Sequence, residues 1–127
     1  MKTPRVVPLP LKDKLKEELD LLEKQGIITS QTKVTDWCAP IVVAPKKNSE
    51  KIRLCVDFNR LNKFVKRERY LSNTPAQAVL DLHGAQVFSV FDAIKGYHQC
   101  ELDEESQDLT TFITPFGRYK YLLRLTA

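Results

Sequence analysis

Cysteines, glycines and long apolar runs are all scarce in this sequence. The three cysteines, Cys38, Cys55 and Cys100, are far apart and form no C-x-x-C pair, which argues against a zinc site and a disulfide framework. Each has apolar neighbours, so we expect buried thiols. No apolar run is long enough to span a bilayer, and Met1 to Arg5 lead into prolines rather than a signal sequence. We therefore expect a soluble, intracellular chain, cytoplasmic or nuclear, with no membrane partner.

The composition fits one folded domain or a piece of a larger one, and its charge is unevenly spread. The chain has 127 residues, of which 43% are hydrophobic, and a net charge of +4. This is enough apolar content for a core and too much for a disordered chain. Residues 46–69 hold nine basic and three acidic side chains, so this segment carries +6 and the remainder −2. The segment indicates a surface for phosphates; the alternative is a solvated loop face.

Two helices are predicted from apolar spacing and capping residues. Leucines recur at helical spacing from Leu11 to Leu22, and Gly26 follows them. This pattern predicts an amphipathic helix that ends at a glycine. Thr74 begins a Thr-Pro-Ala-Gln sequence that matches a capping box with proline at the first helical position. We expect a short helix there, ending near Gly84.

Two hairpins and one strand complete the predicted elements. Residues 37–58 contain two β-prone runs around a polar connection, and the second run alternates from Ile52 to Phe58. Period two places Arg53, Cys55 and Asp57 on the face opposite the apolar side chains. Residues 109–114 and 118–123 are the arms of a second predicted hairpin, with residues 115–117 as its turn. The predicted fold class is α+β, with antiparallel hairpins and helices.

Two candidate sites follow from these elements alone. The first hairpin carries Lys46, Lys47 and Arg53 at one end, an arrangement suited to a polyphosphate because arginine binds phosphate in a bidentate manner and lysine acts as a point charge. Residues 87–91 form an apolar, β-prone run that ends at Asp92, followed by a glycine and Tyr97. A carboxylate at a strand end suits Mg²⁺ beside phosphates; the alternative is a residue that caps a turn.

Several sequence blocks, taken in order, resemble the reverse transcriptase of gypsy-type LTR retrotransposons. The resemblance runs from about Val7 to Tyr121 and thus covers nearly the whole chain. The matching blocks are Trp37-Cys38-Ala39-Pro40-Ile41-Val42, Pro45-Lys46-Lys47, Ile52 to Phe58 with Leu61-Asn62-Lys63, Val87 to Asp92, Gly96-Tyr97-His98-Gln99 and Thr110 to Gly117.

The resemblance implies the fingers and an incomplete palm of a right-hand polymerase. Residues 1–86 correspond to the lead-in, fingers helix and β-hairpin, and residues 87–127 to a partial palm that is truncated before the Tyr-x-Asp-Asp hairpin. Asp92 matches the first catalytic aspartate, which binds Mg²⁺ or Mn²⁺, and Ala93 would offer its backbone carbonyl to a metal. The implied reaction is transfer of a deoxynucleotide to a primer 3′-hydroxyl, for which two metal ions are suited.

The resemblance also implies nucleotide contacts and partners. Tyr97 matches the aromatic residue that excludes a 2′-hydroxyl, and Arg53 matches the arginine that grips the triphosphate. Lys46 or Lys47 matches the fingers lysine near the γ-phosphate, and the loop length leaves the choice open. The implied partners are an RNA or DNA template–primer and a deoxynucleoside triphosphate.

The sequence departs from the family pattern in residues that the polymerase activity needs. The sequence contains no Asp-Asp pair, and a single aspartate leaves two divalent ions short of ligands. The acidic cluster Asp103-Glu104-Glu105 is better interpreted as a turn or helix start. We therefore expect that the chain alone does not polymerise and does not bind the metal tightly.

Two other functions remain open from the sequence. One is a non-catalytic nucleic-acid-binding remnant that uses residues 46–69, with Lys63, Lys66 and Arg67 on the phosphates. The other is an interaction module that binds a partner through the helix of residues 11–22. In relatives the strand that ends at the aspartate pairs with the Tyr-x-Asp-Asp hairpin, so we also expect self-association through an open palm edge.

Overall fold

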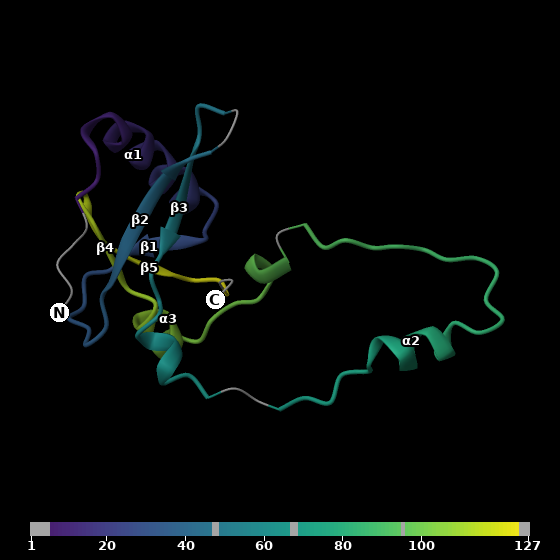
Figure 1. Ribbon diagram of the computed structural model, residues 1–127. Coiled ribbons are helices and arrows are strands. Elements are labelled where there is room, and N and C mark those ends of the chain that lie inside the picture. The colour runs from purple at the N-terminus through teal and green to yellow at the C-terminus, as the bar shows by residue number, and fades with distance from the viewer. Residues whose placement is uncertain (1–5, 47–48, 67–68, 95, 125–127) are drawn as a thin grey trace. The chain divides into compact units, whose positions relative to one another are not determined.

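The computed structural model describes residues 6–46, 49–66, 69–94 and 96–124, and the chain divides into two units. The first unit comprises Met1–Phe64 and Lys95–Ala127, and the second comprises Val65–Ile94. The first contains a five-stranded sheet with the strand order β1-β5-β4-β2-β3 (Figure 1). Its strands are β1 (Ile28–Ser30), β2 (Ala39–Pro45), β3 (Ile52–Val56), β4 (Phe112–Thr114) and β5 (Gly117–Tyr121).

The first helix, α1 (Leu9–Lys24), forms where the leucine spacing predicts it and lies against β1 and β3. Leu15 and Leu19 are completely buried. The helix ends in a Schellman motif, because Gly26 has a φ of +68° and the Ile27 N–H donates to the Leu22 carbonyl at 3.0 Å. Glycine adopts this left-handed conformation without the steric cost of a Cβ. The predicted glycine stop is confirmed.

Both predicted hairpins are present. β2 and β3 pair antiparallel from Ile41↔Val56 to Pro45↔Ile52. β4 and β5 pair antiparallel around a two-residue turn, which closes at Thr114↔Gly117. The Thr114 hydroxyl accepts from the Phe116 N–H at 3.1 Å and donates to the Gly117 carbonyl at 2.8 Å, which fixes the turn.

A parallel pairing joins the two hairpins into one mixed sheet. Ala39 and Pro40 of β2 pair with Phe112 and Ile113 of β4. The sequence predicted antiparallel hairpins, and this parallel contact between segments some seventy residues apart was not among the predictions.

The fold class, a mixture of helices with β-strands, is confirmed. The boundary predicted at residue 86 between fingers and palm stays a prediction.

The core lies between α1 and the sheet. Phe112, at the centre of the sheet, is completely buried and its ring lies 6.0 Å from the Tyr119 ring and 5.2 Å from the Tyr121 ring, measured between centroids. Burial raises the pKa of Tyr121 to about 12, because the phenolate would lose its hydration. These aromatic side chains and the leucines of α1 belong to the buried hydrophobic cluster that holds the first unit together.

A polar network links the end of β1 to α3 (Glu104–Leu109) and β5. The buried Gln31 side chain donates to the Asp108 carboxylate at 2.9 Å, and Lys120 donates to the same carboxylate at 2.9 Å. Asp103 caps the start of α3 by accepting from the Ser106 N–H at 2.7 Å. The acidic cluster at residues 103–105 is therefore a helix start, as predicted.

The second unit contains α2 (Pro75–Asp81) within an otherwise irregular segment (Figure 1). Every described side chain in this unit is exposed. The Thr74 hydroxyl accepts from the Gln77 N–H at 3.3 Å, so the predicted cap is confirmed. The strand predicted to end at Asp92 is wrong, because residues 85–93 form no strand. A strand needs a neighbour for its backbone groups, and none of the described strands pairs with this segment.

The predicted burial of the cysteines is also wrong for two of them. Cys55 and Cys100 are exposed, whereas Cys38 is partly buried. Cys55 lies on the polar face of β3, which the alternation itself had indicated. Within the described part of the chain, no helix combines the length and apolar character needed to cross a bilayer.

Candidate nucleotide and nucleic-acid interface

The β2–β3 hairpin brings two of the predicted nucleotide ligands to one end of the sheet. Arg53 pairs with Ala44 in the antiparallel register, and Lys46 directly follows Pro45, the last residue of β2. The Lys46 N–H donates to the Lys51 carbonyl at 3.0 Å, which extends the pairing into the loop. The side chains of Lys46, Lys51 and Arg53 are all exposed.

Hydrogen bonds hold the loop at this cationic end. The Ser49 N–H donates to the Lys46 carbonyl at 3.3 Å, and the Ser49 hydroxyl accepts from the Lys51 N–H at 3.1 Å. Lys47, the other candidate for the γ-phosphate, lies outside the described residues. Lysine and arginine side chains projecting from a fixed backbone lose less entropy on binding an anion than they would on a free loop. The hairpin end is therefore a cationic surface suited to phosphates.

The remaining predicted nucleotide and metal residues fall in both units. Asp92 and Ala93 lie in the second unit, in the irregular segment, and both are exposed. Tyr97 lies in the first unit, in the short 3-10 helix η2 (Gly96–Gln99), and is 52% exposed. Lys46 and Arg53 thus lie at one end of the same hairpin, whereas Asp92 and Tyr97 belong to different units.

The described residues offer few ligands for a divalent metal. No group of three His, Cys, Asp or Glu side chains comes together among them. Asp92 supplies one carboxylate and Ala93 one carbonyl, whereas two divalent ions in a polymerase site need several converging oxygen ligands. The described residues therefore do not fit a two-metal centre.

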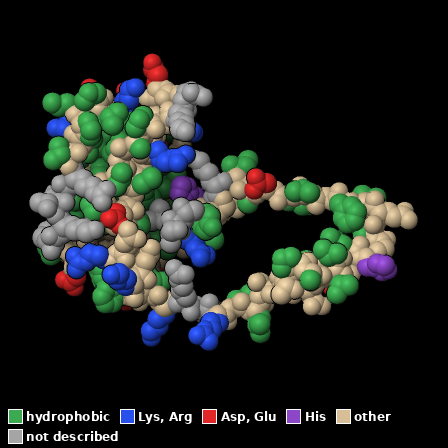
Figure 2. Space-filling view, viewed as in Figure 1, with side chains coloured by type: hydrophobic (Ala, Val, Ile, Leu, Met, Phe, Trp, Pro, Cys, Tyr) green, Lys and Arg blue, Asp and Glu red, His purple; other side chains and the backbone are tan. Residues whose placement is uncertain are grey.

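The basic segment continues beyond β3 into η1 (Leu61–Lys63). Arg60 and Lys63 are exposed at the two ends of η1, and Lys66 is exposed in the second unit. Arg67 lies outside the described residues. Figure 2 shows lysine and arginine side chains at several places on the surface in view.

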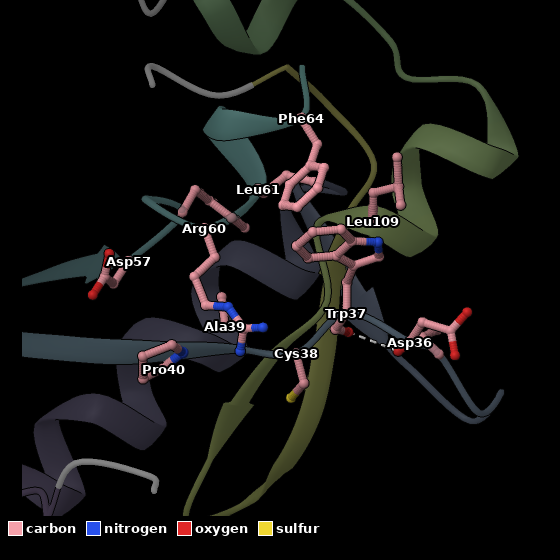
Figure 3. Close-up of a pocket in the computed structure, with 12 residues that line it drawn as sticks. Asp36, Trp37, Cys38, Ala39, Pro40, Asp57, Arg60, Leu61, Phe64 and Leu109 are labelled. Carbon is pink, nitrogen blue, oxygen red and sulfur yellow. Dashed lines mark hydrogen bonds between the residues drawn. The ribbon is translucent and has the colours of Figure 1, made fainter. Parts of the chain in front are cut away.

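A pocket in the first unit was not predicted from the sequence. It has a volume of about 480 Å³ and lies between the segment that enters β2, the end of β3, η1 and α3 (Figure 3). The Trp37 and Phe64 rings meet edge to face in it, with centroids 5.3 Å apart and planes at 66°. The Arg60 side chain lines the same pocket. In the sequence Trp37 is only part of a matching block, and no local signal pairs it with Phe64, so sequence reasoning missed the pocket.

Hydrogen bonds to backbone carbonyls fix two walls of the pocket. The Thr35 hydroxyl donates to the Trp37 carbonyl at 2.8 Å, and the Phe64 N–H donates to the Leu61 carbonyl at 2.9 Å. Cys38 also lines the pocket, and burial raises the pKa of its thiol although Arg118 acts in the opposite direction. The pocket is thus an aromatic recess beside a cation, with a neutral thiol in its wall.

Comparison with known proteins identifies the relatives of this chain. No protein-family model matches the sequence. Over 114 residues, 86% of the chain, it is 30% identical to the retrovirus-related Pol polyprotein from transposon 412 of Drosophila melanogaster, and over 102 residues, 77% of the chain, it is 34% identical to that of transposon 297. The chain is homologous to a segment of retrovirus-related Pol polyproteins. It is also 39% identical, over 95% of its length, to the uncharacterized protein K02A2.6 of Caenorhabditis elegans.

The match to these Pol polyproteins is a match to a small part of each. The chain spans about a tenth of the length of the curated relatives it matches, with 10%, 9% and 9% of their lengths covered. The activities of the whole polyproteins therefore belong to much longer proteins.

Solved structures show the same fold. Foamy viral protease-reverse transcriptase in complex with double-stranded DNA matches 98% of this chain with a TM-score of 0.71 and 22% identity, over 25% of its own length. Native prototype foamy virus protease-reverse transcriptase matches 99% of the chain with a TM-score of 0.75 and 19% identity, over 17% of its length. The mixed fold of this chain is thus shared with a part of these viral proteins.

Proposed function

We propose that the chain is the fingers and first part of the palm of a gypsy-type retrotransposon reverse transcriptase. The observation that carries this proposal is the β2–β3 hairpin, with Lys46 and Arg53 exposed at one end of a fixed antiparallel register. The homology to transposon Pol polyproteins and the fold shared with a reverse transcriptase that was solved with double-stranded DNA support it. In this proposal the hairpin end binds the triphosphate of a deoxynucleotide.

The proposed roles of the other residues follow the same assignment. Tyr97 lies beside the sugar and excludes a 2′-hydroxyl, and Asp92 with the Ala93 carbonyl is the part of the metal site that this chain contributes. Because the described residues do not supply a full set of metal ligands, the 127-residue chain by itself neither binds Mg²⁺ or Mn²⁺ tightly nor extends a primer.

Deoxynucleotide binding tests the role of the hairpin. We expect Arg53→Gln to weaken binding of a deoxynucleoside triphosphate at least about tenfold, since hydrogen bonds to charged groups contribute about 1.5–3 kcal/mol. The matched control is Lys24→Gln, which removes an exposed charge at the end of α1 and should leave binding unchanged. Microscale thermophoresis measures both. Equal binding by the Arg53 variant and the original chain would refute the assignment.

Primer extension tests the proposed lack of independent activity. On an RNA template with Mg²⁺ or Mn²⁺, the chain should give no product above background. Robust extension that Asp92→Asn abolishes would overturn this part of the proposal and show that one aspartate suffices. Manganese titration followed by electron paramagnetic resonance checks metal binding separately, and the Asp92 variant should bind Mn²⁺ as weakly as the original chain.

A second candidate function is a nucleic-acid-binding remnant without a nucleotide site. The observation that favours it is the exposure of Arg60 and Lys63 around η1, and of Lys66 in the second unit. This function predicts salt-sensitive binding of nucleic acid together with no binding of deoxynucleoside triphosphates. The two candidates therefore differ in the outcome of the nucleotide titration.

A further inference from the structure

The pocket beside η1 has the size and lining of a ligand site. Its volume of about 480 Å³ falls within the range of about 300–1,000 Å³ that is usual for small-ligand pockets. All of its lining residues belong to the first unit. It is therefore a property of one unit, at a different place from the hairpin end proposed for the triphosphate.

The aromatic wall of the pocket is open to a planar ligand. Phe64 is 71% exposed even though its ring packs edge to face on Trp37. An exposed phenylalanine that is held in place by a tryptophan offers a flat apolar surface, and its side chain loses little further conformational entropy when a ligand binds. Every nucleobase has a π-face that stacks on such a surface, whatever the sequence.

The charges of the pocket distinguish between kinds of nucleotide. Figure 3 shows Arg60 on the side of the pocket formed by the start of β2, with Trp37 and Phe64 together on the other side. A guanidinium binds a phosphate through paired hydrogen bonds. Asp36 and Asp57 also line the pocket, and their negative charges disfavour a triphosphate far more than a single phosphodiester.

We propose that this pocket takes one unpaired base of a single-stranded nucleic acid, which stacks on the Trp37–Phe64 pair while Arg60 contacts the adjoining phosphodiester. The inference rests on the proposed function, because it assumes that nucleic acid is a partner of the chain. It adds a place where the strand is held by a base rather than by its phosphates alone.

The single tryptophan of the chain gives a direct test. All tryptophan emission comes from Trp37, so a base that stacks there quenches it. The full chain is titrated with oligothymidylate and with an abasic oligonucleotide of the same length, and binding is followed independently by anisotropy of a label on the oligonucleotide. We expect both strands to bind, since both carry phosphates, and only the strand with bases to quench Trp37 and shield it from acrylamide.

Variants locate the contact. Phe64→Leu keeps an apolar side chain but removes the ring, and we expect it to weaken oligothymidylate binding about fivefold or more while leaving binding of the abasic strand unchanged. The matched control is Phe116→Leu, an exposed phenylalanine in the β4–β5 turn, which should change neither. Arg60→Gln should weaken binding of both strands.

The outcomes separate this inference from the proposed function. Binding of both strands with equal quenching, or with no quenching, would overturn the base-stacking proposal and leave nucleic-acid binding intact. If anisotropy shows that neither strand binds, nucleic acid is not the partner and both proposals are refuted. Loss of oligothymidylate binding in the Phe116 variant equal to that in the Phe64 variant would also overturn the assignment to this pocket.

Discussion

Replacement of Phe112 by alanine tests whether the five strands form one cooperative core. Phe112 lies in β4, pairs with Ala39 on one side and Tyr119 on the other, and has no exposed surface. Truncating a fully buried phenylalanine costs about 3–5 kcal/mol, because the transfer free energy is lost and a cavity remains. Domains of this size are stable by about 5–15 kcal/mol. The variant should therefore be marginally folded.

Urea unfolding followed by Trp37 fluorescence measures this loss. The indole lies in the segment that enters β2, two residues before Ala39, so its emission reports on the first unit. The control is Phe116→Ala in the same hairpin, where the side chain is 41% exposed and the ring lies 5.8 Å from the Lys16 ammonium. We expect the control to lose no more than about 1 kcal/mol.

The comparison of the two phenylalanines can refute the account of the core. If Phe112→Ala destabilises the first unit by less than about 1 kcal/mol, or by no more than Phe116→Ala, then β4 does not lie at the centre of a packed sheet. A large loss with a changed denaturant slope would mean instead that the unfolded or native state has changed in compactness.

Three further predictions concern titration, thiol reactivity and association. Hydrogen bonds, first from Lys120, hold the pKa of Asp108 below its ordinary value. The ionised carboxylate therefore stabilises the fold at a pH above the ordinary pKa, and this stabilisation is lost as the pH falls below about 4. Asp108→Asn should lower the urea midpoint at neutral pH, and an equal effect of the substitution in strong acid would contradict this. Exposed Cys55 should be alkylated faster than Cys38, whose thiol has a raised pKa. Mass spectrometry of the peptides measures the two rates, and equal rates would contradict the placement of Cys38 in the wall of the pocket. Phe91 is 94% exposed in an apolar run, so light scattering should show concentration-dependent association that Phe91→Lys reduces, whereas a monodisperse monomer would argue against association through this run.

Local features of the fold could be predicted because their causes are local. The spacing of the leucines and Gly26 determine α1 and its end, and the period of two in residues 52–58 determines which face of β3 is polar. Thr74 and Asp103 cap helices through their own side chains, within three residues of the groups that they bind. Signals of this kind do not depend on what the rest of the chain does.

Features that depend on distant partners could not be predicted. The parallel contact of Ala39 with Phe112 joins segments that have no local signal for each other. The run before Asp92 has the composition of a strand, but β-propensity describes a fit to a neighbouring strand rather than a backbone preference. The pocket was missed for the same reason, since Trp37 and Phe64 meet only because β2 and η1 lie side by side in the folded unit.

The salt dependence of nucleic-acid binding tests most directly the central claim that both candidate functions share, namely that the chain holds nucleic acid through its basic residues. The full chain is titrated with a template–primer between about 50 and about 200 mM salt, alongside a variant in which Lys63, Lys66 and Arg67 are replaced by glutamine. We predict that affinity falls steeply with salt and that the logarithmic slope of the variant is shallower by about 2–3. Affinity that is indifferent to salt, or an unchanged slope in the variant, would contradict the claim that this chain holds nucleic acid through its basic residues.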